Sequence, residues 1–552
     1  MHGCVIFNYS LSQFFKVQII YFCLKGSRKG KGMNNRLQSF DFQSHAFSFV
    51  YEHIVKEAVS ELLFSTSFTK VKKCFVIFDD AIYNSVLNLC FELEDICILA
   101  LSSKIDRQDI LLNKFSLGSM ESIEPLQIQI SQLDYDRLTT HLLKRAKYWV
   151  DSLRLILEHI FVDRYVIEKF IKKTNKNTPC MVINEIASGL SDSHGEGKTV
   201  AKIVIENTVL YYKPRNGQAE KLLSEFIGLV ISEGFPANLN TLEVISRPDY
   251  TWSVGLVRSR QASKIDAEQY HYYAGSLLCL SWLFGMTDLY HENIFSDHGG
   301  PIVIDAEGIL QPNTSQNQSR IWEILRTGLV GLYTYDNNNV ISDDISGFHM
   351  RTIITKYTEK VICRNNLSGM RILSRITHRN NIRGNALYDE VGVVVNGLKY
   401  IEYFLNGFME SHSFLRRWLS KTSGASLIDM IDNTFESRVF LRPTKEYILI
   451  RNGLIQKNIF PSNLEDSSFM LHENNCDVIS AEMNSIYVGD VPMFHAKVDE
   501  CSLYSGSTMI CDDYFQKSAI SAFQERIRPG SYFLEPLDDL ICDLTKIILG
   551  RG

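Results

Sequence analysis

The chain has 552 residues, of which 45% are hydrophobic and 22% are charged, and its formal net charge is −6. This length exceeds what one hydrophobic core usually supports and predicts about two to four domains. The composition argues against disordered and collagen-like classes, and the acidic balance argues against general nucleic-acid binding, which usually needs a basic surface.

The first 35 residues combine apolar stretches with a basic cluster. Polar residues interrupt the apolar part, and four basic residues between positions 25 and 31 follow it. A signal peptide has the opposite order, and the uninterrupted apolar runs are too short to span a membrane. Two interpretations stay open: residues 1–35 belong to the protein, or they are an over-called N-terminal extension before a true start at Met33.

Twelve cysteines are scattered along the chain, and no two of them form a C-x-x-C pair. This spacing does not support a zinc site built from such pairs or a secreted disulfide framework. Since no segment reaches transmembrane length, we expect a cytoplasmic protein with reduced thiols and without membrane insertion.

Residues 36–180 form a mostly helical N-terminal region. The segment 148–161 (YWVDSLRLILEHIF) has apolar residues at helical spacing, and the segment 73–79 (KCFVIFD) predicts a short buried strand. No chemical motif occurs in this region, so we expect it to serve as a scaffold or a partner surface.

The pattern changes after residue 180. Residues 200–213 (VAKIVIENTVLYYK) contain two β-rich runs, as in a hairpin, and residues 217–232 have the apolar spacing of an amphipathic helix. Residues 267–284 predict another helix, and residues 301–305 (PIVID) predict a short buried strand with an acid at its end.

The sequence TDLYHEN lies between that second helix and the strand. It places Asp288 and Asn293 at the offset that separates the base from the magnesium-binding asparagine in protein kinases. We therefore predict Asp288 as the group that orients the attacking hydroxyl, with Asn293, Asp305 and Glu307 as ligands of Mg²⁺. The alternative is that Asp288 caps a helix and that Asp305 is a surface acid at the end of a strand.

A cation is expected at the end of the predicted hairpin. Lys213 ends an alternating strand in YYKPR, the position from which a kinase lysine reaches the phosphates of ATP, and Arg215 adds a forked cation. Taken alone, a lysine at the end of a strand is usually just solvated. Its acidic partner should lie on the following helix, where Glu220 flanks the apolar stripe and Glu225 lies nearly opposite it.

The segment GEGKT (195–199) ends like a Walker loop. The full Walker pattern needs a glycine five positions before Gly197, where this chain has Asp192. The segment is therefore not a Walker loop. A glycine-rich turn before a hairpin fits a kinase-style loop that covers the phosphates, so we expect Gly195 and Gly197 to lie near the nucleotide.

Five sequence motifs that follow one another along the chain are more specific than the general kinase pattern. They are SDSHGEGKTVAKI (191–203), YYKPR (211–215), TDLYHEN with PIVIDAEG (287–308), RVFLRPT (438–444) and GDVPMF (489–494). Together they resemble the dehydratase domain of class II lanthipeptide synthetases, the LanM family, from about residue 180 to the C-terminus.

The resemblance implies an α+β fold with a kinase-like, two-lobed core closest to lipid kinases. The small lobe would span about residues 181–262 and the large lobe about residues 263–552, after the helical region at residues 36–180. Family members continue into a cyclase domain that holds zinc, but this chain stops where the dehydratase would end. We therefore expect no cyclase domain within it.

The resemblance also implies a two-step reaction on a ribosomal precursor peptide with a leader. A Ser or Thr hydroxyl is phosphorylated from ATP with Mg²⁺, and the phosphate is then eliminated to leave dehydroalanine or dehydrobutyrine. A separate cyclase and a membrane transporter would be further partners. The matching positions are Lys213, Asp288, Asn293, Asp305 and Glu307 for phosphorylation, Asp192 and His194 in the glycine-containing loop, and Arg438 and Thr444 for elimination.

One position of TDLYHEN departs from the family pattern Asp-x-His-x-Glu-Asn. Tyr290 stands where the histidine is expected, and His291 follows it. Since a phenol cannot be a cation at neutral pH, either the activity is reduced or the loop shifts so that His291 substitutes. Two alternatives to a dehydratase stay open: a kinase-like enzyme that only phosphorylates a peptide or small molecule, and an inactive peptide-binding relic.

Overall fold

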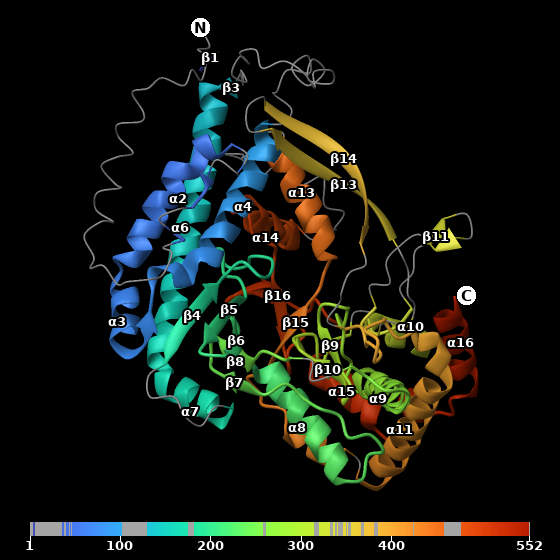
Figure 1. Cartoon of the computed structure of the whole chain (residues 1–552). Helices are drawn as coiled ribbons and strands as arrows, with labels where there is room; N and C mark the ends of the chain where they lie inside the picture. The colour runs from blue at the N-terminus through green and yellow to red at the C-terminus, as the bar shows by residue number, and fades with distance from the viewer. Residues whose placement is uncertain are drawn as a thin grey trace.

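A computed structural model gives the architecture of the chain (Figure 1). The fold is α+β. The described residues are 4–5, 36–37, 40–42, 45, 47–101, 130–174, 181–257, 261–313, 319–331, 335–336, 339–340, 346–348, 350, 355–365, 369–379, 385–422, 424–456 and 476–550. Apart from residues 4–5, the extension predicted at residues 1–35 lies outside the described part of the chain.

Helices dominate the described part of the N-terminal region. They are α2 (Ser48–Leu63), α3 (Thr66–Cys74), α4 (Tyr83–Leu101), α6 (Gln132–Val162) and α7 (Arg164–Thr174). The helix predicted at residues 148–161 lies within α6, which contacts α2, α3 and α4. The strand predicted at residues 73–79 is reduced to β2 (Val76–Ile77), because the chain turns into the short helix η3 (Asp79–Ile82).

A six-stranded sheet lies beside these helices, with its strands in the order β2-β4-β5-β6-β8-β7. The strand β2 is parallel to β4, and the other pairs are antiparallel. The hairpin predicted at residues 200–213 is formed by β5 and β6. The strand bounds are β4 (Val182–Ala187), β5 (Ala201–Ile205), β6 (Thr208–Lys213), β7 (Val244–Ser246) and β8 (Thr251–Val254).

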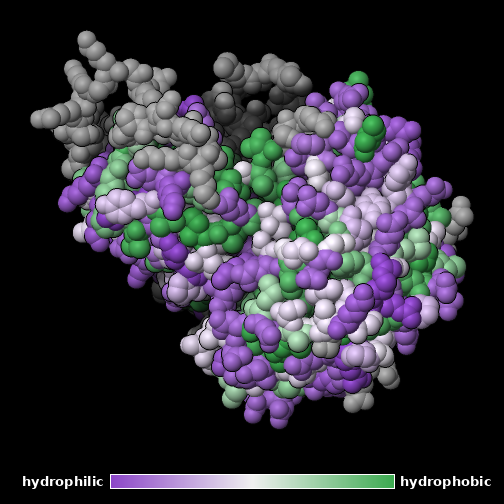
Figure 2. Space-filling model, turned by 90° about the horizontal axis from the view of Figure 1, so that it is seen from below, coloured by the Kyte–Doolittle hydropathy of each residue, from purple (hydrophilic) through white to green (hydrophobic). Residues whose placement is uncertain are grey.

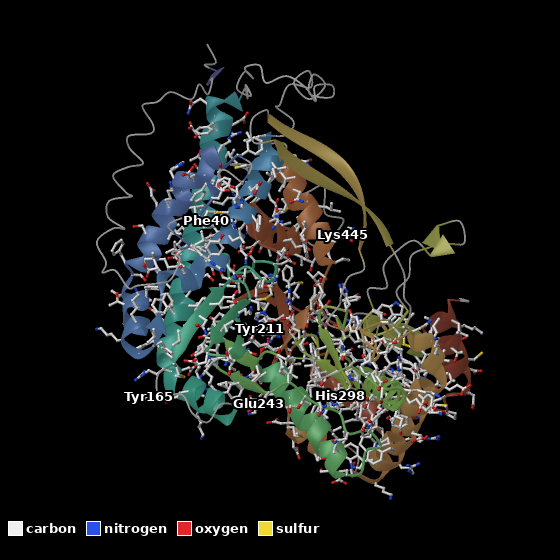
Figure 3. All side chains as sticks on the ribbon, viewed as in Figure 1. Phe40, Tyr165, Tyr211, Glu243, His298 and Lys445 are labelled. Atoms are coloured by element: carbon white, nitrogen blue, oxygen red, sulfur yellow. The ribbon has the colours of Figure 1, made fainter. Side chains whose placement is uncertain are left out.

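One hydrophobic core joins the N-terminal helices to this sheet. Figure 3 shows the side chains that these elements carry. Leu93 of α4 and Leu153 of α6 are buried in the same cluster as Ile203, Leu210 and Trp252 of the sheet. Alternate residues of β5 point to this core, as the two-residue period of a strand requires. The helices therefore cover one face of the sheet.

The helices α9 (Lys264–Leu283) and α11 (Ile401–Thr422) form the centre of the C-terminal part. They pack closely because glycines lie at their contact. A Cβ atom on Gly275 would lie 1.9 Å from the carbonyl oxygen of Phe404, and one on Gly407 would lie 1.9 Å from that of Tyr272. The helix predicted at residues 267–284 is α9, and the capping box of Ser263 starts it three residues earlier.

Other helices surround this central pair. They are α8 (Gln218–Ser232), α10 (Arg320–Arg326), α12 (Ala425–Asp429), α15 (Ala519–Ile527) and α16 (Asp538–Leu549), with the short helices η5 (Gly397–Tyr400) and η8 (Tyr532–Leu534). The hairpin of β9 (Ile294–Asp297) and β10 (Gly300–Val303) follows the TDLYHEN loop. The strand predicted at residues 301–305 corresponds to β10, which already ends at Val303, so Asp305 lies on the loop after the strand and not at its end.

A four-stranded antiparallel sheet comes from the last part of the chain, in the order β15-β16-β17-β18. Its strands are β15 (Glu436–Val439), β16 (Phe494–Lys497), β17 (Leu503–Ser505) and β18 (Thr508–Cys511), and α13 (Thr444–Gln456) and α14 (Cys476–Tyr487) lie between β15 and β16 in sequence. The remaining strands are β1 (Cys4–Val5), β3 (Ile130–Ser131), β11 (Tyr335–Asp336), β12 (Asn339–Val340), β13 (Thr355–Asn365) and β14 (Gly369–Arg379).

Hydrophilic and hydrophobic residues are interspersed on the face of the molecule that Figure 2 shows. Among the helices of the described residues, none combines the length and the apolar character that a membrane crossing requires.

Candidate functional site

Lys213 lies at the end of β6, where three oxygen atoms surround its amino group. Its Nζ donates to Oε1 of Glu220 at 3.1 Å, to Oδ2 of Asp305 at 3.1 Å and to the carbonyl oxygen of Ile304 at 2.6 Å. The side chain of Lys213 is 9% exposed and that of Glu220 only 2%. The lysine is therefore an ion-paired, buried group rather than a solvated one.

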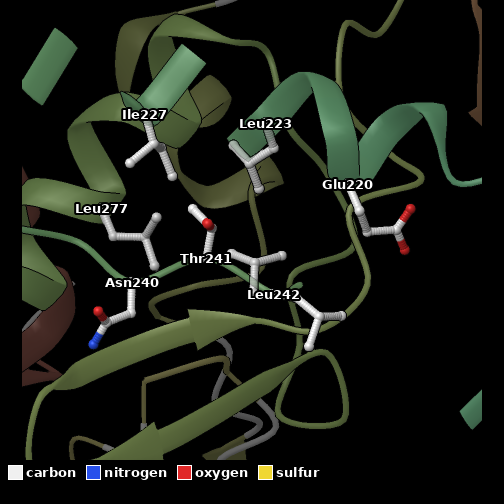
Figure 4. A pocket seen from close by; sticks show the side chains of 8 residues that line it. Glu220, Leu223, Ile227, Asn240, Thr241, Leu242 and Leu277 are labelled. Carbon is white, nitrogen blue, oxygen red and sulfur yellow. The ribbon is translucent and has the colours of Figure 1, made fainter. Parts of the chain in front are cut away.

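The choice between the two glutamates of α8 follows from their side of the helix. Glu220 lies in the first turn of α8 and faces Lys213, whereas Glu225 is exposed and pairs with Lys221 on the surface. The apolar side chains Leu223 and Ile227 line a small pocket together with Glu220 (Figure 4). An apolar surrounding strengthens the attraction between buried opposite charges.

Arg215 joins the same cluster as a second cation. Its guanidinium donates to both carboxylate oxygens of Glu220, at 3.0 and 2.5 Å, and to Oδ1 of Asp305 at 2.5 Å, and its Nε lies 3.1 Å from Oε2 of Glu307. Burial alone would raise the pKa of Glu220 and Asp305, but Arg215 and then Lys213 hold both pKa values below their ordinary range. Both carboxylates are therefore ionised at neutral pH.

Glu307 extends the cluster to the second sheet. Arg438 of β15 donates from its Nη1 to Oε1 of Glu307, and its backbone N–H donates to the carbonyl oxygen of Glu307 at 3.1 Å. The Nη2 of Arg438 lies 3.5 Å from Nε2 of His194 in the glycine-containing loop. A continuous network of charges thus runs from Lys213, through Arg215 and Glu307, to Arg438.

His194 is held in a neutral form with a defined tautomer. Its Nδ1 lies 2.8 Å from the carbonyl oxygen of Val491, so Nδ1 carries the proton and donates it, which leaves Nε2 as the acceptor toward Arg438. Burial, followed by the charge of Arg438, lowers the pKa of His194.

Asp288 occupies a left-handed backbone conformation, with a φ of 63°, in the loop between α9 and β9. Asn293 donates from its Nδ2 to the carbonyl oxygen of Asp288 at 2.7 Å and to Oδ2 at 3.2 Å. No helix starts at Asp288 within this described loop, so the aspartate is not a helix cap.

Burial, with the charges of Glu307 and Asp305, raises the pKa of Asp288 to about 7. A carboxyl with this pKa can exchange protons near neutral pH.

Tyr290 and His291, where the chain differs from the family pattern, have different surroundings. Tyr290 is half-buried, and burial together with the charge of Asp288 raises its pKa. His291 has its Nε2 3.7 Å from Oε1 of the exposed Glu292. At this position of the loop the structure therefore places a phenol within electrostatic reach of Asp288, and the cation whose charge acts on that carboxyl is Arg438.

The glycine-containing loop is a tight turn. His194 and Lys198 exchange two backbone hydrogen bonds, and Gly195, Glu196 and Gly197 between them have φ values of 47°, 69° and 79°. Gly197 is buried against α6, and a Cβ atom there would lie 2.6 Å from Cβ of Tyr148. The requirement for glycine at position 197 therefore comes from packing as well as from its φ.

Two predicted residues lie at the edge of this constellation. Thr444 is half-buried at the first position of α13, and among the described residues the ion-pair network does not include it. Asp192 is exposed, and its carbonyl oxygen accepts from the hydroxyl of Ser191.

The predicted magnesium ligands fit the ion in the type of their donor atoms. Asp305 and Glu307 supply carboxylate oxygens and Asn293 an amide oxygen, which Mg²⁺ prefers. Among the described residues, however, no group of three or more His, Cys, Asp or Glu side chains is arranged to hold a metal ion. Lys213 and Arg215 donate to the carboxylate of Asp305, and Arg438 donates to that of Glu307.

Two further residues lie next to the site without having been assigned a role from the sequence. Asp490 contacts the glycine-containing loop. It belongs to the GDVPMF motif, so the sequence did contain a signal that this residue matters. Arg145 of α6 contacts Asp490 and Ser193. No motif surrounds Arg145 in the sequence, so only the structure shows this contact.

The fold and the site define an α+β protein with a buried cluster of ion-paired side chains. A family model described as "Domain of unknown function (DUF4135)" matches residues 135–497, and the chain belongs to this family. It is also similar to the lacticin 481/lactococcin biosynthesis protein LcnDR2 of Lactococcus lactis subsp. lactis, with 22% identity over 330 residues. The match covers 55% of this chain and 35% of that relative. Both findings support the resemblance to class II lanthipeptide synthetases.

Proposed function

We propose that this chain dehydrates Ser and Thr residues of a ribosomal precursor peptide, by phosphorylation from ATP and subsequent elimination of phosphate. The observation that carries the proposal is the network that connects Lys213, Glu220 and Asp305 with Glu307 and Arg438. The name of the relative, a biosynthesis protein of lacticin 481 and lactococcin, supports a role in lanthipeptide modification.

The proposed core is kinase-like and has two lobes. The six-stranded sheet with α8 corresponds to a small lobe, since it carries a lysine on a strand and its glutamate on the following helix. The region from α9 onward corresponds to a large lobe, since it carries the Asp288–Asn293 loop and Asp305.

In the first step, the hydroxyl oxygen of the peptide attacks the γ-phosphorus of ATP, and the bond to the bridging oxygen of ADP breaks. Asp288 orients the hydroxyl and accepts its proton, for which a pKa of about 7 is well suited. Lys213 and Arg215 would move from the carboxylates to the phosphate oxygens. Asn293, Asp305 and Glu307 would hold Mg²⁺, which would supply positive charge that neutralises the phosphates.

In the second step, a base removes the α-proton, its electron pair forms the Cα–Cβ double bond, and the Cβ–O bond to phosphate breaks. Negative charge then develops on the departing phosphate. Arg438 presents a forked guanidinium, and the hydroxyl of Thr444 would add a second donor. Glu307 and His194 hold Arg438 in place before the phosphate arrives.

Mass spectrometry tests the proposal directly. The chain is incubated with its precursor peptide, ATP and Mg²⁺, and the masses of the peptide products are measured. Loss of one water per modified residue is expected. Unmodified peptide and unchanged ATP would show that the chain is a peptide-binding relic.

A kinase without elimination is the second candidate, because Thr444 lies outside the ion-pair network of the described residues. Such an enzyme would add one phosphoryl group per modified residue without a later loss. The same mass measurement, followed over time, separates the two candidates.

A further inference from the structure

The GDVPMF motif (489–494) is hydrogen-bonded to the glycine-containing loop, although the two segments lie almost 300 positions apart. Asp490 accepts through Oδ2 from the backbone N–H groups of Glu196 and Gly197, at 2.7 and 3.0 Å. The backbone N–H of Val491 donates to the carbonyl oxygen of Ser193 at 2.8 Å. These bonds leave the two amides facing a protein carboxylate rather than a phosphate.

Arg145, on helix α6 of the N-terminal region, binds both of these segments. Its Nη1 donates to Oδ1 of Asp490 at 2.8 Å and to the carbonyl oxygen of Val488 at 3.1 Å, and its Nη2 donates to Oγ of Ser193 at 3.0 Å. Its Nε donates to Oε1 of Glu92 at 2.6 Å. The side chains of Arg145 and Asp490 are only 4% and 2% exposed, so the pair is sealed from solvent.

The turn needs this support because its backbone is strained. Glu196 has a side chain and a φ of 69°, in a region that residues other than glycine rarely occupy. Such a conformation persists only where the surroundings impose it. A charged acceptor for two successive amides supplies that constraint.

The GDVPMF motif also fixes the position of His194. The carbonyl oxygen of Val491 accepts from Nδ1 of His194 at 2.8 Å, and the other ring nitrogen faces Arg438. A shift of Asp490 would therefore move both the turn and the imidazole beside Arg438.

We propose that Asp490 and Arg145 are positioning residues, which hold the glycine-containing loop and His194 in the geometry that the reaction requires. The loop is thus set jointly by the N-terminal helices and by the C-terminal part of the chain. The assignment deepens the proposed function and rests on it for its catalytic consequence, whereas the effect on the loop conformation does not depend on it.

The test uses the full chain with Asp490→Asn, and Arg145→Lys as a second variant that keeps a buried cation. The matched control is Asp163→Asn. Asp163 is likewise a buried aspartate. It accepts from Arg247, the residue after β7, at 3.0 and 2.7 Å, and from the side chains of Tyr250 and Trp252, and none of these donors belongs to the loop. Urea unfolding of every variant shows that it is folded, so Arg145→Lys carries the test if Asp490→Asn does not fold.

Hydrogen exchange of the amides in residues 194–198 is measured first. We expect exchange at Glu196 and Gly197 to be roughly tenfold faster in Asp490→Asn and Arg145→Lys, and unchanged in Asp163→Asn. Wild-type exchange rates in both folded loop variants would overturn the proposal.

Steady-state kinetics with the precursor peptide follow. We expect the KM for ATP to rise roughly tenfold in the two loop variants, with a smaller change in kcat, and to stay at the wild-type value in Asp163→Asn. An unchanged KM in a variant with faster loop exchange would overturn the catalytic part of the proposal. If the wild-type chain does not turn over the peptide, the proposed function fails while the exchange result still decides whether Asp490 holds the loop.

Discussion

Arg438 donates to the carboxylate of Glu307 from a strand that lies 131 positions later in the sequence. The backbone of the same two residues is linked as well, since the N–H of Arg438 donates to the carbonyl oxygen of Glu307 at 3.1 Å. Because Arg215 pairs with the other oxygen of Glu307, one carboxylate joins the residues proposed for phosphorylation to those proposed for elimination. The two steps would therefore take place in one site.

The two glutamates of α8 provide a matched pair of variants. Glu220→Gln removes a buried charge that Lys213 and Arg215 share, so we expect phosphorylation of the precursor peptide to fall about a hundredfold or more. Glu225→Gln removes an exposed charge and is expected to leave the rate within about twofold. Initial rates of ADP release measure both, and equal rates for the two variants would contradict the role of Glu220.

Arg438→Ala is expected to separate the two steps. The phosphorylated peptide should accumulate, because loss of one donor to a departing anion typically costs about 3–4 kcal/mol, which is roughly several hundredfold in rate. A time course of peptide masses measures the phosphorylated and dehydrated forms. Arg438→Lys serves as the comparison, since it keeps the charge without the fork. Dehydration at the wild-type rate in Arg438→Ala would rule out its assigned role.

Tyr290 and His291 are expected to respond differently to substitution. Tyr290→His places an imidazole beside Asp288 and restores the family pattern, so we expect the rate of phosphorylation to rise. His291→Ala removes a side chain paired with the exposed Glu292 and should change the rate by about twofold or less. A strong loss of activity in His291→Ala would instead show that His291 substitutes for the missing histidine.

Gly275 and Gly228 allow the close contact of α9 with α11 to be tested through stability. A Cβ at position 275 would lie 1.9 Å from the carbonyl oxygen of Phe404, so Gly275→Ala should destabilise the protein by about 3 kcal/mol or prevent folding. No atom lies within 4 Å of a Cβ at position 228 on α8, so Gly228→Ala should be neutral or stabilising by up to about 1 kcal/mol. Urea unfolding measures both, and similar effects of the two variants would contradict the tight packing.

His271 should make the stability depend on pH. Burial lowers its pKa in the folded state from 6.5 to about 4, while its Nδ1–H donates to the carbonyl oxygen of Ala267 at 2.6 Å. Between these two pH values the unfolded chain binds more protons, so the free energy of unfolding falls as the pH falls from about 6.5 to 4, by up to about 3 kcal/mol. In His271→Asn, whose amide can donate the same bond, the pH profile of urea unfolding should be flatter. An identical slope in both proteins would exclude this contribution.

Much of the site can be placed from the sequence because local periodicity defines the elements that carry it. The alternating run before Lys213 predicts a strand, and the apolar stripe of the next helix distinguishes Glu220 from Glu225. The contact of Asp490 with the glycine-containing loop cannot be predicted in this way, since it joins segments almost 300 positions apart. The left-handed backbone of Asp288 is also not visible in its residue type, because tertiary contacts impose it.

The core shared by the N-terminal helices and the six-stranded sheet has a thermodynamic consequence. Leu153 of α6 and Trp252 of β8 are buried in the same cluster, and β2 adds an edge strand to the sheet from within the helical region. Removal of the helices would expose one whole face of the sheet to water. The helices and the sheet should therefore unfold in a single cooperative transition, and the sheet that carries Lys213 would not exist as an independently stable unit.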